Sequence, residues 1–166
     1  MGNLITYCRR PDLAAVQMSN GLTSVFVSVL SLAASTLAQT DRQREFAVWF
    51  ASHDQDVYGL GIVGFDVSEL PWRAEAFETD RDFVLGAIEA AKAKTGWVRL
   101  GYSPREEWVL DCLERFQHLV ASFDIRDAGA EPESSWSLGD RPVSFELCPE
   151  HAIYCHSAGC ILCNDR

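Results

Sequence analysis

Six cysteine and histidine side chains fall within residues 148–163, near the end of the 166-residue chain. Thiolate and imidazole groups are the ligands that zinc prefers in proteins, and packing alone does not require so many of them. Two pairs, Cys148-x-x-His151 and Cys160-x-x-Cys163, have the spacing at which each pair forms a turn and four ligands close a tetrahedron. The sequence therefore predicts a structural Zn²⁺ held by Cys148, His151, Cys160 and Cys163.

The segment between the two pairs is long enough for a short hairpin, with 152–154 leading out and 157–159 turning back. A metal bound across the base of this hairpin would hold the two pairs together. The segment has too few apolar residues to fold alone, so we expect the metal to fold and anchor it. The expected organisation is a globular domain over residues 1–147, with a zinc-binding hairpin over 148–166 packed on it.

This pattern resembles the short zinc ribbons and zinc knuckles of many unrelated proteins, and the resemblance covers only residues 148–163. It departs from common versions because its second ligand is a histidine and because Cys155 and His156 are further candidates. The sequence leaves open whether either of them replaces a ligand. A four-ligand site is closed and structural, whereas a three-ligand site keeps a water molecule that can do chemistry. The cysteine spacing is also compatible with metal-free reduced thiols or with a disulfide pair.

A second polar cluster, His53-Asp54-Gln55-Asp56, precedes a glycine-rich segment. Two carboxylates and an imidazole suit metal binding or acid–base chemistry, as in a metal-dependent hydrolase that uses His53, Asp54 and Asp56. The interpretation we favour is a solvated helix end and loop, because no matching second cluster occurs in the chain. The glycines at 59, 61 and 64 form a lone G-x-G-x-x-G that lacks the strand before it and the helix after it, so a dinucleotide site is disfavoured.

Composition bounds the class of protein. With 166 residues and 48% hydrophobic residues, the chain is long enough for one ordinary core. Its formal net charge of −10 should repel phosphate backbones, so we expect no nucleic-acid binding despite the zinc motif. The same charge favours a protein partner with a basic surface. The isolated Cys8 and Cys112, together with the cysteine and histidine cluster, indicate a reducing, cytoplasmic environment.

Residues 22–38 are almost uncharged and superficially resemble a signal peptide or a membrane span. Their periodicity argues against both, because Ser24, Ser28, Ser31 and Ser35 recur at helical spacing along one stripe. We expect a buried amphipathic helix whose small side chains let another element approach closely, and no membrane association.

The other periodicities predict a single, mostly helical α+β domain with a few short strands. Further helices are expected over 41–52, 79–94 and 104–123, with Thr40 and Ser103 as N-caps, and a helical turn over 11–18. Phe46, Trp49 and Phe50 should form the buried face of the helix over 41–52. Trp108 should be the first residue of the buried face of the helix over 104–123. Short strands are expected over 4–7, 58–67, 97–102 and 142–147.

The function these features favour is a non-catalytic, acidic, partner-binding protein stabilised by zinc. In size and charge it resembles the immunity and antitoxin proteins that neutralise basic toxins. Trp72 and Trp136, on loops, are candidate anchors for the partner, unless their rings are instead part of the core. The second function we consider is a metal-dependent hydrolase that uses His53, Asp54 and Asp56 or an open zinc site.

Overall fold

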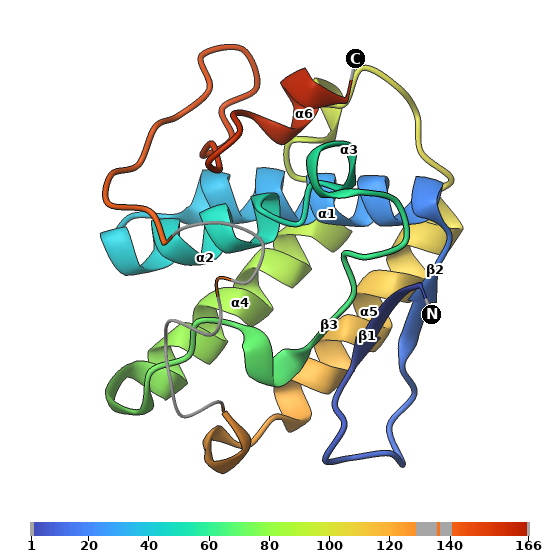
Figure 1. Cartoon of the computed structure of the whole chain (residues 1–166), viewed down its shortest axis with the longest axis vertical. Helices are drawn as coiled ribbons and strands as arrows, with labels where there is room; N and C mark the ends of the chain where they lie inside the picture. The colour runs from blue at the N-terminus through green and yellow to red at the C-terminus, as the bar shows by residue number, and fades with distance from the viewer. Residues whose placement is uncertain (1, 129–135, 137–140, 166) are drawn as a thin grey trace.

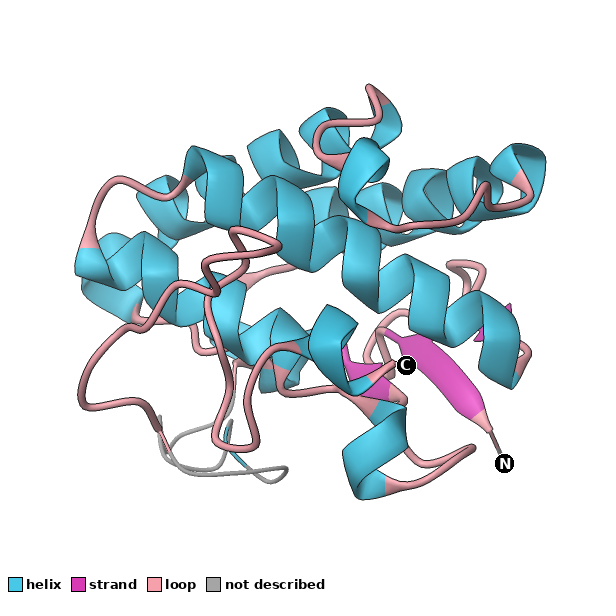
Figure 2. Ribbon diagram, turned by 90° about the horizontal axis from the view of Figure 1, so that it is seen from above, coloured by secondary structure: helices cyan, strands magenta, loops and turns pink. Residues whose placement is uncertain are grey.

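A computed structural model describes residues 2–128, 136 and 141–165. Its long helices are α1 (Asn20–Leu37), α2 (Asp41–Ala51), α4 (Phe77–Lys92) and α5 (Glu106–Ser122). The shorter elements are the single-turn helices α3 (Gln55–Tyr58) and α6 (Ile161–Asn164) and the strands β1 (Asn3–Thr6), β2 (Val16–Met18) and β3 (Phe65–Asp66), in the sheet order β2-β1-β3. Figure 2 shows that helices make up most of the molecule and that the strands lie to one side. The predicted mostly helical α+β class is confirmed.

Helix α1 is the central element and packs against α2, α4, α5 and β2. By length and composition it is apolar enough to cross a membrane, but 61% of it is buried inside the fold. Three serines of the predicted stripe, Ser28, Ser31 and Ser35, are among its buried residues. In Figure 1, α3 and α6 lie on one side of α1, and α4 and the sheet lie on the other. The stripe of small side chains is therefore covered by other elements of the fold.

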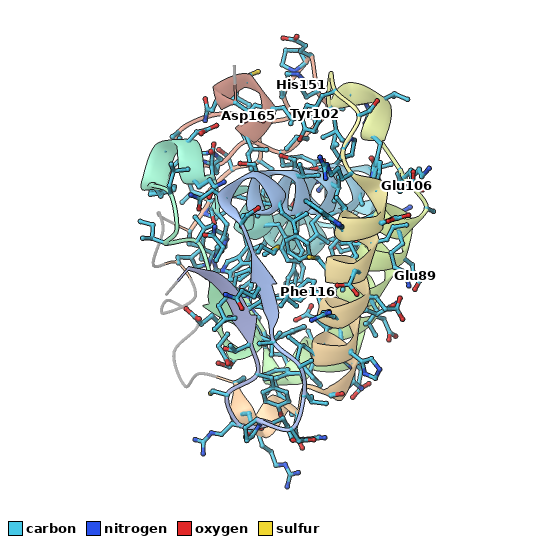
Figure 3. All side chains as sticks on the ribbon, turned by 90° about the vertical axis from the view of Figure 1, so that its right-hand side faces the viewer. Glu89, Tyr102, Glu106, Phe116, His151 and Asp165 are labelled. Carbon is cyan, nitrogen blue, oxygen red and sulfur yellow. The ribbon has the colours of Figure 1, made fainter. Side chains whose placement is uncertain are left out.

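The core is rich in aromatic rings. Phe46, Trp49 and Phe50 of α2 are all buried, as the sequence predicted. Phe116 of α5 lies at the centre and makes edge-to-face contacts with the rings of Phe26, Phe50 and Phe65 (Figure 3). Such contacts add to the hydrophobic free energy of burial.

Neither of the two tryptophans predicted as exposed anchors is exposed. Trp72 is stacked on Phe123 and donates a hydrogen bond from Nε1 to the carbonyl oxygen of Val67 at 2.8 Å. Trp136 is also buried. The prediction that either tryptophan binds a partner is therefore wrong, because the apolar rings are used in the core.

Four local predictions of secondary structure are wrong in whole or in large part. Of the strand expected over 58–67, only Phe65–Asp66 pairs in the sheet, and Tyr58 belongs to α3. Residues 11–18 do not form a helical turn, because Val16 and Met18 are buried on one face of a strand that pairs with β1. Residues 97–102 form a 3₁₀ turn instead of a strand, since the left-handed Gly96 and Gly101 break extended backbone at both ends. Residues 142–147 form no strand apart from one isolated bridge between Leu147 and Tyr154.

Helix α5 begins later than the sequence indicates. Its N-cap is Arg105, without a capping side chain, so Ser103 and Pro104 lie outside the helix. Val109, Cys112 and Phe116 form the predicted buried stripe. Trp108, which the periodicity also assigned to that stripe, is 54% exposed. The first turn of α5 therefore projects beyond the core.

A buried ionic network joins α2 to α4. Glu45 is buried and lies 3.0 Å from Arg42 and 3.1 Å from Arg141, measured between charged side-chain atoms. Arg42 also pairs with the buried Asp80 at 2.7 Å and donates to the carbonyl oxygen of Pro71. Burial raises the pKa of Asp80 despite the neighbouring Arg42. The guanidinium of Arg42 thus compensates two carboxylates that have little access to water.

Candidate metal centre

The four predicted ligands meet in one place. One ligand atom from each of Cys148, His151, Cys160 and Cys163 lies within 4.8 Å of all the others. Nδ1 of His151 is 3.6 Å from the sulfurs of Cys148 and Cys160 and 3.4 Å from that of Cys163. The sulfurs of Cys148 and Cys163 are 3.8 Å apart. These residues lie close enough to hold a metal ion.

The distances agree with a particular coordination geometry. In a tetrahedral zinc site, the usual Zn–S and Zn–N bond lengths place two sulfurs about 3.8 Å apart and a sulfur about 3.6 Å from a nitrogen. The four separations given above agree with these values to within about 0.2 Å. Three sulfurs and one imidazole nitrogen therefore form a set of donors that fits zinc.

Two short turns bring the ligand pairs together. In the first, the backbone N–H of Ala152 donates to the carbonyl oxygen of Cys148 at 2.9 Å, and Ala152 adopts a left-handed conformation with φ 53°. In the second, Cys160 is the N-cap of α6, and the N–H of Asn164 donates to its carbonyl oxygen at 3.0 Å. Each turn places the ligand atoms of its two residues close together, as the spacing predicted.

The three thiols of the cluster differ in how readily they ionise. Burial opposes ionisation of Cys148, but the backbone N–H groups of His151 and Glu150 donate to its sulfur and lower its pKa to about 7. Burial raises the pKa of Cys160 to about 12 and also raises the pKa of Cys163. Without a cation the three thiols do not ionise together at neutral pH, whereas metal ligation requires thiolates.

The two additional candidates lie outside the group of four ligands. Nε2 of His156 is 2.9 Å from Oδ2 of Asp54, and its Nδ1 accepts a hydrogen bond from the N–H of Ala158 at 3.1 Å. Both ring nitrogens are therefore occupied, and the imidazole is neutral with its proton on Nε2. Cys155 is partly buried, and its sulfur is not part of the cluster.

Polar contacts attach residues 148–165, the candidate metal-binding segment, to the helices. Asp54 accepts a second hydrogen bond from the side chain of Asn164 at 3.0 Å. Near the other end, the N–H of Tyr154 donates to Oγ of Ser35 in α1 at 3.0 Å, and its hydroxyl accepts a hydrogen bond from Arg44 of α2 at 3.0 Å. Ser35 belongs to the serine stripe of α1, so this stripe forms a hydrogen bond with the C-terminal segment.

The side chains of His53, Asp54 and Gln55 are buried, and only Asp56 of this cluster is exposed. The interpretation of 53–56 as a solvated loop is therefore wrong for three of its four residues. A matching cluster does exist, in His156 and Asn164, but it lies more than a hundred positions away, and no local pattern in the sequence indicates the pairing. Asp54 caps α3 and connects that helix to the metal-binding segment.

His53 is enclosed by aromatic rings. Its ring centroid lies 4.2 Å from that of Trp49 and 5.0 Å from that of Phe65, and Nδ1 donates to the carbonyl oxygen of Trp49 at 2.8 Å. Burial lowers the pKa of His53 to about 4. The neutral imidazole is thus part of the aromatic core.

His53 should make the protein less stable in weak acid. Between pH 6.5 and 4 the unfolded chain binds a proton at this residue and the folded chain does not, so stability is complete above pH 6.5 and falls as the pH drops towards 4. We expect the free energy of unfolding to decrease by about 2 kcal/mol more in the wild type than in His53→Met between pH 7 and 5. Urea unfolding at both pH values measures this difference, and parallel pH profiles would contradict it.

Comparison with known proteins found no matching family, no similar curated protein and no similar solved structure.

Proposed function

We propose that this chain is a non-catalytic protein-binding module whose C-terminal segment is folded around a structural zinc ion. The observation that carries the zinc assignment is the set of donors, in which three sulfurs and one nitrogen of His151 lie within 4.8 Å of one another. Four protein ligands complete a tetrahedron and leave no position for a catalytic water. Elemental analysis of the purified protein should find one zinc per chain, and its absence would contradict the assignment.

The contacts of the second cluster support a non-catalytic role. A histidine that acts as a general base needs one ring nitrogen directed at a substrate. His156 uses one nitrogen for Asp54 and the other for a backbone N–H, while the ring of His53 packs against Trp49 and Phe65. These side chains hold the segment in place, which gives little support to a hydrolase function.

The partner we propose is a protein with a basic surface, as in the immunity and antitoxin type of interaction. The net charge of −10 supports this class because it would accelerate association with a basic protein. The exposed face of α5 carries Glu107, Asp111 and Glu114, with the exposed Trp108 at its start. Arg105 covers one face of the indole at 4.7 Å from its centroid. Tryptophan and arginine are enriched among the residues that dominate the binding energy of protein interfaces.

Replacing Trp108 should weaken partner binding without loss of stability. We expect Trp108→Ala to reduce the affinity for a co-purified basic partner by at least about tenfold. Val143→Ala, which truncates another exposed apolar side chain, is the matched control and should bind normally. Affinities measured at low and at moderate salt should also fall with ionic strength. The proposal would be contradicted if the wild-type protein elutes alone from lysate at low salt. Equal affinities of the two variants for the partner would contradict it as well.

A further inference from the structure

An apolar pocket of about 230 Å³ opens between the beginnings of α1 and α5. It is lined by Leu22 and Val25 of α1 and by Trp108 and Val109 of α5. Figure 1 shows that both helices begin at the same edge of the molecule. An apolar cavity of about 150 Å³ is large enough to hold a benzene molecule, whereas pockets for drug-sized ligands usually exceed about 300 Å³. The pocket therefore suits one apolar side chain of another protein better than an organic substrate.

Trp108 is the exposed wall of this pocket. Its side chain is 54% exposed, whereas the neighbouring Val109 is 1% exposed. The guanidinium of Arg105, the only charged group in the lining, lies 4.7 Å from the centroid of the indole ring. This cation–π contact holds the ring in place. An apolar group that enters the pocket therefore meets a preformed surface, which reduces the entropy cost of binding.

A second exposed apolar group lies on the other side of the first turn of α1. Leu60 and Ile62, in the loop between α3 and β3, are 64% and 58% exposed. This loop is held against the beginning of α1, because Gln55 donates to the carbonyl oxygen of Asn20 and a Cβ placed on Gly61 would lie 4.0 Å from Oδ1 of Asn20. We call the pocket, Trp108, Leu60 and Ile62 the docking surface.

Carboxylates without basic partners flank the docking surface. Asp56 precedes the loop and Glu107 precedes Trp108, and both are exposed. Among the residues that the structure describes, no lysine or arginine pairs with either carboxylate. Residues 13–40 contain no charged side chain, and residues 45–72 contain no lysine or arginine. Apart from Arg105, which is stacked on Trp108, the docking surface has no group that would repel a basic partner.

We propose that the docking surface binds a segment of the partner protein in which one large apolar side chain, such as phenylalanine, lies between lysine or arginine residues. The apolar side chain would fill the pocket beside Trp108, and the flanking cations would pair with Asp56 and Glu107. This inference rests on the proposed partner-binding function, and it adds the position and the chemistry of the contact.

Gly21 offers a way to block the pocket without disturbing the core. It is exposed in the first turn of α1, it lines the pocket, and a Cβ added to it meets no atom within 4 Å. In Gly21→Leu the new side chain would occupy the pocket. Since leucine is favoured over glycine in helices, this variant should be at least as stable as the wild type. Gly86→Leu in α4 is the matched control, because a Cβ there also meets no atom within 4 Å and Gly86 does not line the pocket.

The test uses the peptide Lys-Lys-Phe-Lys-Lys, acetylated and amidated at its ends, and follows the indole N–H signal of Trp108 by NMR at low salt. We expect a dissociation constant of about 1 mM or below for the wild type. Lys-Lys-Ala-Lys-Lys, which lacks the apolar side chain, should bind at least about tenfold more weakly. Glu-Glu-Phe-Glu-Glu should also bind at least about tenfold more weakly, because its charge is reversed.

The two glycine variants complete the test. Gly21→Leu should bind Lys-Lys-Phe-Lys-Lys at least about tenfold more weakly than the wild type, and Gly86→Leu should bind it normally. The inference would be overturned if the Trp108 signal of the wild type does not move, or if the phenylalanine and alanine peptides bind equally. Equal affinities of the two variants, or tighter binding of the glutamate peptide, would overturn it as well. Binding of the co-purified partner to Trp108→Ala is measured separately, so failure of this inference is distinguishable from failure of the proposed function.

Discussion

Replacement of Cys160 by serine should reduce the bound zinc from one ion per chain to none and lower the Tm by roughly 10 °C. Cys160 is a buried member of the four-ligand cluster, so replacing it removes one of the four donors that would hold the zinc. The metal-binding segment also buries Ile153, Ile161 and Leu162 against the core. Release of the metal should loosen this packing, and the free energy of zinc binding is lost from folding. Elemental analysis and thermal unfolding of the same samples measure both effects.

Cys155→Ser is the matched control for this prediction. Cys155 lies in the same segment and is also a free thiol, but its sulfur is outside the cluster. We expect this variant to retain one zinc and to unfold close to the wild-type temperature. Loss of zinc from Cys155→Ser would show that the ligand set is wrong. A wild-type protein that contains no zinc, or whose Tm a chelator leaves unchanged, would refute the role of the metal.

The second large effect is expected at Arg42. Arg42→Met leaves the buried carboxylates of Glu45 and Asp80 without the guanidinium that lies 3.0 Å and 2.7 Å from them. Removal of one partner from a buried ionic network typically costs about 3–5 kcal/mol, because the remaining charge is buried without compensation. Arg141 and Arg73 still contact Glu45, so most of the loss should come from Asp80. Urea unfolding at pH 7 measures the change.

A double variant separates buried charge from packing. Arg42→Met combined with Asp80→Leu removes both charges of one pair and should recover much of the lost stability. Arg115→Met is the surface control, because Arg115 and its partner Asp111 are both about half exposed or more, and unfolding should be almost unchanged. An equal loss in Arg42→Met and Arg115→Met would contradict the argument that burial sets the size of the effect.

Local patterns in the sequence determined much of the fold and the candidate ligands. The positions of α1 and α2 follow from helical periodicity and from the Thr40 cap, which accepts a hydrogen bond from the N–H of Gln43. The ligand pairs follow from spacing, since the two residues of each pair lie on one short turn. In these cases the interacting residues are close together in the sequence as well as in space. A local sequence pattern is therefore enough to predict their interactions.

Only the tertiary structure decided which side chains meet across the chain. His156 is hydrogen-bonded to Asp54 and lies outside the candidate metal cluster, and Gln55 is buried because α3 packs on the serine stripe of α1. The short strands and the exposure of Trp108 are also tertiary outcomes, because pairing and burial depend on what lies opposite a residue. A contact between positions 54 and 156 leaves no periodic trace in either segment, and for that reason the sequence alone could not reveal it.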